Sequence, residues 1–233
     1  MGKIMRNIPK TLQLLICTII IFCGGFLALE GTDVSAVGTA SYNFNVSMSV
    51  TDQLALTCQP ATSTYPNALS PTIAGVDGGT ATSSIDQFNC TTTSNDNSGW
   101  QLSVHVTSTP AMTLIGGADS VADHTITNSY NFASVAAGEA KFGFAASTTI
   151  ATDLVTAFRN NGSACGGAGT NNSNIHCWSG FNGNTPVSVI DTTHATASTG
   201  QVTKFTFKVK SGATRFLTTG TYNAHVNITV VNK

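Results

Sequence analysis

The stretch WQLSVHVTS, residues 100–108, decides the fold class because apolar and polar residues alternate along it. Side chains of a β-strand point in turn to the two faces of a sheet, so alternation predicts a strand with one buried face. The residues predicted to face inward are Trp100, Leu102, Val104 and Val106. Trp100 is therefore expected in the core.

Three other stretches alternate in the same way: SYNFNVSMSV at 41–50, KFTFKVK at 204–210 and TYNAHVNITV at 221–230. In the second, Phe205, Phe207 and Val209 are predicted to face inward, and three lysines outward: Lys204, Lys208 and Lys210. Segments rich in Gly, Asn, Asp and Ser separate the strands. Short strands joined by such turns predict an all-β fold, an antiparallel β-sandwich.

One short helix is predicted at 148–161, TTIATDLVTAFRNN, where Thr148 or Thr149 can cap the first turn. Its apolar residues recur at helical spacing: Ile150, Leu154, Val155 and Phe158. The Gly- and Asn-rich stretch from Asn160 to Asn174 is predicted to form a long exposed loop.

The N-terminus has the pattern of an export signal, with basic residues before an apolar run at 12–29. Cleavage after Ala36 or Ala40 is predicted, which leaves a sandwich domain at 41–233 behind a leader and linker at 1–40. The run, about 18 residues, is also long enough to remain as a membrane anchor. The segment GGFLALE at 24–30 resembles a type IV prepilin processing site, but the apolar run precedes it instead of following it.

The chain carries few charges: 9% of its residues are charged and its net charge is −1. Soluble proteins average about a quarter. No basic or acidic field exists to drive nucleic-acid binding, which is therefore not expected. With 41% hydrophobic residues the chain is expected to fold.

Four cysteines remain after the leader: Cys58, Cys90, Cys165 and Cys177. An even number in an exported chain favours disulfides. Of three pairings, Cys58–Cys90 and Cys165–Cys177 are preferred, and the second would hold the base of the long loop. The alternative is a metal site formed by Cys165, His176 and Cys177, but the close spacing of zinc ligands is missing. No metal or cofactor is expected.

No catalytic residues are predicted. The sequence has no G-x-S-x-G motif, its histidines are scattered, and Glu139 is the sole glutamate after residue 40. By strand parity His105 and His225 should face outward. Asp119 and Asp123 are interpreted as turn-forming residues, rather than as ligands of a shared calcium ion.

A ligand-binding alternative rests on the loop NIHCWSGFNGN at 174–184. There Trp178 and Phe181 can stack on a sugar ring while Asn182 bonds its hydroxyl groups. In the other interpretation, Trp178 folds back into a small satellite core.

Two short resemblances point to bacterial surface proteins. SGWQLSVHV at 98–106 resembles the first Trp-x-Leu motif of WxL surface domains, which implies non-covalent attachment to peptidoglycan; Ile228-Thr229-Val230 stands where the second motif is expected. The early Cys58, NCTTT at 89–93 and the final Gly-Thr-Tyr at 220–222 resemble fimbrial and spore-coat-U-like subunits.

The sequence thus predicts an exported, non-enzymatic, structural or adhesive protein, either secreted or on the cell surface, as a wall-associated or fibre-type subunit. Its expected partners are a cell-wall polymer or glycan, and other copies of itself through the terminal strands. Contact with a membrane is expected only through residues 12–29. The alternative function is a carbohydrate- or peptidoglycan-binding module that uses the loop aromatics.

Overall fold

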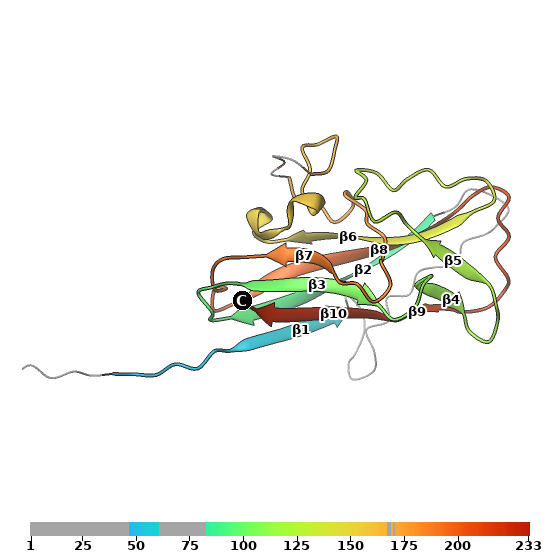
Figure 1. Cartoon of the computed structure of the whole chain (residues 1–233). Helices are drawn as coiled ribbons and strands as arrows, with labels where there is room; N and C mark the ends of the chain where they lie inside the picture. The colour runs from blue at the N-terminus through green and yellow to red at the C-terminus, as the bar shows by residue number, and fades with distance from the viewer. Residues whose placement is uncertain (1–46, 61–82, 167–168, 170) are drawn as a thin grey trace, which may run out of the picture. The chain divides into compact units, whose positions relative to one another are not determined.

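The computed structural model describes residues 47–60, 83–166, 169 and 171–233. Residues Val50–Lys233 form one compact unit. Its strands, shown in Figure 1, are β1 (Leu54–Pro60), β2 (Ser83–Ser94), β3 (Trp100–Val106), β4 (Met112–Leu114), β5 (Ser120–Asp123), β6 (Ala140–Thr148), β7 (Val187–Asp191), β8 (Gln201–Ser211), β9 (Tyr222–Ala224) and β10 (Val226–Asn232).

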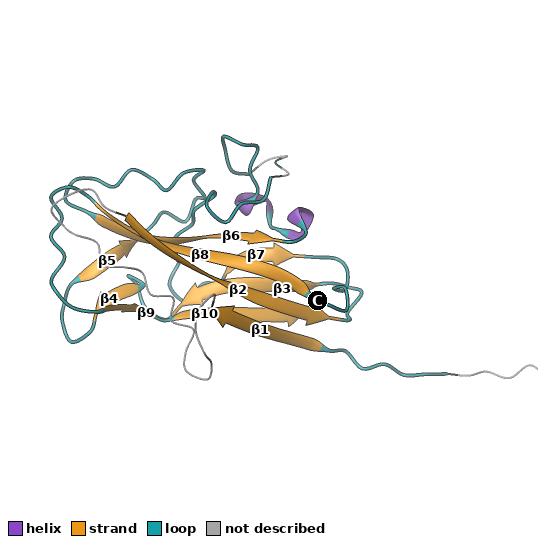
Figure 2. Cartoon of the chain, turned by 180° about the vertical axis from the view of Figure 1, so that it is seen from behind, coloured by secondary structure: helices purple, strands orange, loops and turns teal. Residues whose placement is uncertain are grey.

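The strands form two sheets, which confirms the all-β prediction. One sheet has seven strands in the order β1-β2-β8-β6-β5-β4-β9, and the other has three in the order β10-β3-β7. Figure 2, seen from behind, shows β3, β7 and β10 on the far side of β2, β6 and β8. The described strand pairs are antiparallel, except that β5 and β6 run parallel. That pair departs from the purely antiparallel prediction.

Strands β3 and β8 have the buried faces that alternation predicted. In β3 every second residue from Trp100 to Val106 is buried. In β8 Phe205, Phe207 and Val209 are buried, and Lys204, Lys208 and Lys210 on the other face are only partly covered. Thr206, on the same outward face, is fully buried. Both strands lie in the middle of their sheets, so one face of each meets the core.

The final alternating stretch forms two strands rather than one. Tyr222–Ala224 is β9, which pairs with β4 in the seven-stranded sheet. After His225 the chain continues as β10, which pairs with β3 in the three-stranded sheet. The chain therefore passes from one sheet to the other at His225, and the apolar residues of both halves still pack against the same core.

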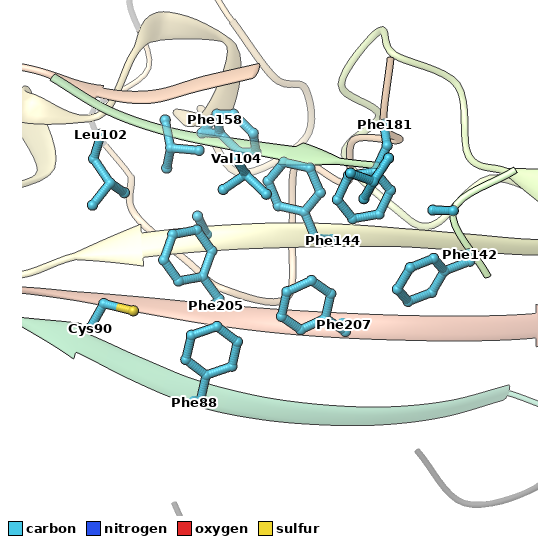
Figure 3. Packing of buried hydrophobic residues seen from close by; sticks show 14 of the residues in the cluster. Phe88, Cys90, Leu102, Val104, Phe142, Phe144, Phe158, Phe181, Phe205 and Phe207 are labelled. Atoms are coloured by element: carbon cyan, nitrogen blue, oxygen red, sulfur yellow. The ribbon is translucent and has the colours of Figure 1, made fainter. Parts of the chain in front are cut away.

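Phenylalanine rings fill the space between the sheets (Figure 3). Phe144 lies 5.0 Å from Phe181 and 5.5 Å from Phe158, measured between ring centroids. On the other side Phe88 stacks with Phe205 and Phe207, at 5.5 and 5.6 Å. Burying each such ring contributes up to about 3 kcal/mol, and a favourable ring pair adds about 1 kcal/mol.

The helix predicted at 148–161 is wrong. Strand β6 extends to Thr148, and the following residues form two single 3-10 turns, η2 (Ala151–Asp153) and η3 (Thr156–Phe158). Leu154 and Val155 between them are extended, because they bond to β7: Leu154 bridges to Ile190 and the Val155 N–H donates to Val189 O. Pairing with β7 thus replaces the intrahelical hydrogen bonds, and the β-branched Ile150 and Val155 have a low helix propensity that favours this outcome.

The strand predicted at 41–50 is not formed at its described end. Residues 47–50 belong to no strand, and residues 41–46, with the leader at 1–40, lie outside the described residues. Among the residues that are described, no helix is long and apolar enough to cross a membrane.

Candidate functional site

Both preferred disulfides are present. Cys58 and Cys90 are direct partners in the β1–β2 register, with Cα atoms 3.9 Å apart. Cys165 and Cys177 are bonded with Cα atoms 5.5 Å apart, and Cys177 adopts a positive φ of 58°. Because the two sulfur atoms are bonded to each other, they are not thiolate ligands for a metal with His176. Two disulfides indicate an oxidising environment.

The long loop at 160–174 is only partly exposed. Asn160 is buried and bridges to both Cys165 and Asn171. Residues 161–164 are exposed, as predicted, while residues 167, 168 and 170 lie outside the described part. The disulfide and these bridges close the base of the loop.

Trp178 lies inside a satellite cluster, which consists of Phe132, Ala145 and Trp178 on the outer face of β6. Its indole is 3% exposed, its Nε1–H donates to Ile175 O at 3.0 Å, and its ring meets the edge of Phe132 at 5.3 Å. The satellite-core interpretation therefore describes this tryptophan.

Phe181 is also buried, at 3% exposure, but in the main core against Phe142 and Phe144. Asn182 is exposed and forms a turn in which the Thr185 N–H donates to its carbonyl at 3.0 Å. Burial of Trp178 and Phe181 in two different clusters leaves neither ring face open for stacking, so this structure gives no support to the alternative of a sugar site formed by Trp178, Phe181 and Asn182.

Gly180 explains why this loop can lie so close to the neighbouring chain. Its N–H donates to Thr125 O at 2.8 Å, and a Cβ there would come within 1.7 Å of His124 O. His124 is buried below it. Its Nδ1 lies 3.0 Å from Thr125 O and its Nε2 accepts from the Ala133 N–H at 3.2 Å. Burial lowers the pKa of His124, and these two contacts select the neutral ring.

Two of the other histidines, His194 and His176, contact groups of the protein itself. His194 Nε2 lies 3.1 Å from Asp153 Oδ1, and its Nδ1 lies 2.8 Å from Ala195 O, two contacts that raise its pKa. His176 stacks on Tyr130 with centroids 4.1 Å apart. His105 is half-buried and His225 is exposed. The ring nitrogens of His194 are both occupied, so the His194–Asp153 pair does not present a free base.

Asp119 and Asp123 serve separate purposes in the fold. Asp119 accepts hydrogen bonds from the Thr218 N–H at 2.8 Å, from the Tyr222 hydroxyl at 2.6 Å and from Arg215. Partial burial opposes ionisation, but these bonds outweigh it and lower the pKa of Asp119. Burial, with the adjacent carboxylate, raises the pKa of Tyr222 to about 12. Asp123 instead accepts from the Ala111 N–H at 3.0 Å.

One side of the sandwich is sealed. The outer edge of β7 bonds to Leu154 and Val155, and β6 exchanges two bonds with Ser179: the Phe144 N–H donates to Ser179 O, and the Ser179 N–H donates to Phe144 O, both at 2.8 Å. We call β6, β7 and the covering residues 150–181 the sealed side. Backbone groups on a sheet edge need partners, and here the chain supplies them.

The opposite side is open. Among the described residues, β1 pairs only with β2, and β10 pairs only with β3. The two strands lie beside each other in both Figure 1 and Figure 2 and contact one another. Their inward apolar residues are only partly buried: Leu56, Cys58, Val226, Ile228 and Val230. We call these two outer strand edges the open edge.

The residues that precede β1 are held by the turn between β2 and β3. Asn95, in the turn between β2 and β3, accepts from the Gln53 N–H at 2.6 Å and donates its Nδ2–H to Thr51 O at 2.9 Å. Just before the residues that Asn95 holds, Val50 is 65% exposed and Met48 is 85% exposed. The alternating segment therefore has bare apolar side chains where its structure is described.

Comparison with known proteins leaves the function to be argued from these features. No protein-family model matches the chain, and neither a curated protein nor a solved structure matches it.

The sequence predicts self-association through the terminal strands, which include β10, but it does not select β1 or show that the two strands lie at one edge. Alternation at 221–230 was visible, but it does not tell a strand in the middle of a sheet from one at its edge. The segment that sequence reasoning did select, 174–184, is instead part of the two hydrophobic clusters.

Proposed function

We propose that the protein is an exported, non-enzymatic structural subunit of the cell surface, which associates with copies of itself by strand pairing. In this proposal the alternating segment 41–50 of one copy pairs with the open edge of another. The observation that carries it is the exposure of Met48 and Val50, two inward-type residues of a segment with complete alternation.

Exposed apolar residues in register favour pairing with a sheet. Met48 and Val50 share strand parity with Tyr42, Phe44 and Val46, so an extended chain would present all of them on one face. An extended segment added to a sheet gains main-chain hydrogen bonds, while alternate side chains bury apolar surface. Neither gain is made by residues 47–50 within a single chain, since no strand includes them.

The open edge has the complementary properties. Strands β1 and β10 leave one row each of N–H and C=O groups without a strand partner in the described structure. The half-buried Leu56 and Ile228 border these rows. Such edges pair readily with another chain unless charge or proline blocks them. Strand β10 contains neither proline nor any charged residue.

The low charge suits a subunit that packs closely with its neighbours, because no large field keeps copies apart. The two disulfides fit an exported protein, and the disulfide Cys58–Cys90 ties β1 to β2 next to the open edge.

The test compares two double variants of the exported full-length protein. Met48→Asp with Val50→Asp places two charges on the apolar face of the segment, and it should abolish self-association in sedimentation velocity and filaments in electron microscopy. Ser47→Asp with Ser49→Asp adds the same charge on the other face and should leave association nearly unchanged. The thermal unfolding of the compact unit should be alike in both.

The proposal fails if both double variants associate to the same extent as the parent protein, or if both lose association equally. The first outcome shows that the segment is not used, and the second shows that added charge, rather than strand parity, controls association.

A further inference from the structure

The outer face of the seven-stranded sheet carries positive charge without matching negative charge. On strands β2, β6 and β8, the outward positions that the structure describes include four lysines and no acidic residue: Lys141, Lys204, Lys208 and Lys210. We call this surface the lysine face. It belongs to the broad side of the sheet and is separate from the open edge.

The register sets the spacing of these charges. Lys210 lies directly opposite Lys141 in the β6–β8 pair, and Lys208 faces Gly143. Residues two apart on a strand are about 6.6 Å apart on the same face, so Lys204 and Lys210 lie about 20 Å apart along β8. Like charges directly opposite each other destabilise a sheet. The arrangement is costly unless an anion lies against it.

The protein compensates the charge of Lys141, which interacts with Glu139 and with Asp123. Lys141 forms an ion pair with Glu139 at 3.4 Å, and that carboxylate is 51% exposed. In the described structure no ion pair involves Lys204, Lys208 or Lys210. Their cross-strand neighbours on β2 are uncharged: Asn89 faces Lys204 and Ile85 faces Lys208.

The chain that covers part of this face adds no acid either. Residues 124–135 and 171–181, which contribute the satellite cluster, contain no aspartate or glutamate. The Lys208 ammonium is held over two of their rings, 5.3 Å from the centroid of Phe132 and 5.5 Å from that of Trp178. These rings fix one charge of the row in place. Burial, with the charge of Lys210, lowers the pKa of Lys208.

We propose that the lysine face binds a linear phosphodiester polymer of the cell surface. The covering chain crosses this face between Lys204 and Lys208, where Asn174 donates to the buried Thr206, so the charges lie on both sides of the crossing. Charges spread over about 20 Å fit a chain of repeated charges better than a single anion. All four cations are lysines, which bind phosphate as point charges, whereas planar carboxylates are recognised best by the fork of arginine. The surrounding amide of Asn89 and hydroxyl of Ser147 can bond to a polyol backbone.

This inference does not depend on self-association, because it uses the face of the sheet and not its edge. The test therefore uses the Met48→Asp, Val50→Asp form if that form is monomeric, and the parent protein if it is not. Binding to linear poly(glycerol phosphate) is measured by calorimetry over a range of salt concentrations. The logarithm of the affinity should fall with the logarithm of the salt concentration, with a slope of about −3 for four contacts.

Single-charge variants locate the site. Lys204→Gln and Lys210→Gln should each weaken binding about fivefold and reduce the slope by about 0.7. Lys233→Gln removes the same charge from the C-terminus, where Lys233 pairs with Asp191, and should leave binding unchanged. All three residues are partly or fully exposed, so folding should survive, which circular dichroism can check.

Two further polymers test the chemistry. Polygalacturonate carries carboxylates, and oligothymidylate carries phosphodiesters on a nucleic-acid backbone; both should bind more weakly than poly(glycerol phosphate). Stronger binding of either polymer overturns the assignment. Equal affinities of Lys204→Gln, Lys210→Gln and Lys233→Gln for poly(glycerol phosphate) overturn the location.

Discussion

The two sides of the sandwich have similar alternating sequences, but they differ in whether another segment of the chain pairs with the outer strand. On the sealed side, Ile190 of β7 is fully buried, because residues 150–158 bond to the outer edge of its strand. On the open edge, Ile228 occupies an equivalent inward position on β10 of the same three-stranded sheet, yet it is only half-buried. The difference shows that alternation places a side chain inward, whereas a neighbouring strand decides how deeply it is buried.

The largest expected effect comes from truncating these two isoleucines. Ile190→Ala should lower the free energy of unfolding by about 4 kcal/mol, within the range for fully buried aliphatic residues. Ile228→Ala in the monomer should cost about 1–2 kcal/mol, because less apolar surface is lost. Urea denaturation of the two variants measures both values. Equal losses would show that the open edge is closed in solution.

The disulfide Cys58–Cys90 lies next to the open edge, and Cys165–Cys177 lies on the sealed side. Loop-closure entropy predicts that the pair Cys58→Ala with Cys90→Ala, at a separation of 32 residues, lowers stability by about 4 kcal/mol. Cys165→Ala with Cys177→Ala, at a separation of 12, should cost about 3 kcal/mol. Thermal unfolding under non-reducing conditions compares them. A much larger loss for the second pair would mean that the sealed side depends on its disulfide more than on its hydrogen bonds.

The smallest expected effect is the dependence of stability on pH that comes from His124. Burial lowers the pKa of His124, so below the ordinary value of 6.5 the unfolded chain takes up a proton that the folded chain does not. The contribution of His124 to stability, present above pH 6.5, should therefore fall as the pH drops, by at most about 1.4 kcal/mol per pH unit. The raised pKa of His194 contributes in the opposite direction and offsets part of this fall. Denaturation at pH 7.5, 6.5 and 5.5 measures this slope.

His225 provides the control for this pH effect, since it is exposed at the point where the chain changes sheets. His225→Asn should leave the contribution of His124 in place, whereas His124→Asn should remove it and leave the opposing contribution of His194. Because the second variant also disturbs packing, the ring signals of His124 in the parent protein should be followed by NMR. A normal titration of that ring near pH 6.5 would contradict the prediction.

The parts of the fold that sequence reasoning predicted correctly are strands with one buried and one exposed face. In β3 and β8 the environment of the two faces differs sharply, so the residues alternate visibly. The pairing of Cys58 with Cys90 was also accessible, because Cys58 shares the parity of the apolar Leu54 and Leu56.

Other parts could not be predicted because distant segments determine them. In β6 most positions are buried on both faces, since Phe132 and Trp178 cover its outer side, and alternation is lost. Residues 148–161 show helical spacing, but β7 bonds to Leu154 and Val155 and holds them extended. Phe181 is buried because its loop, residues 174–184, folds back onto Phe142 and Phe144 of β6.

The sequence by itself determined the β class, the inward faces of β3 and β8, and the low charge of the surface, because these follow from local alternation and composition. Only the tertiary structure decided which strands lie at an open edge, that the loop aromatics are buried, and that Lys141 joins the lysines of β8. Those properties depend on which segment lies beside which, and no local pattern specifies a neighbour that is far away in the chain.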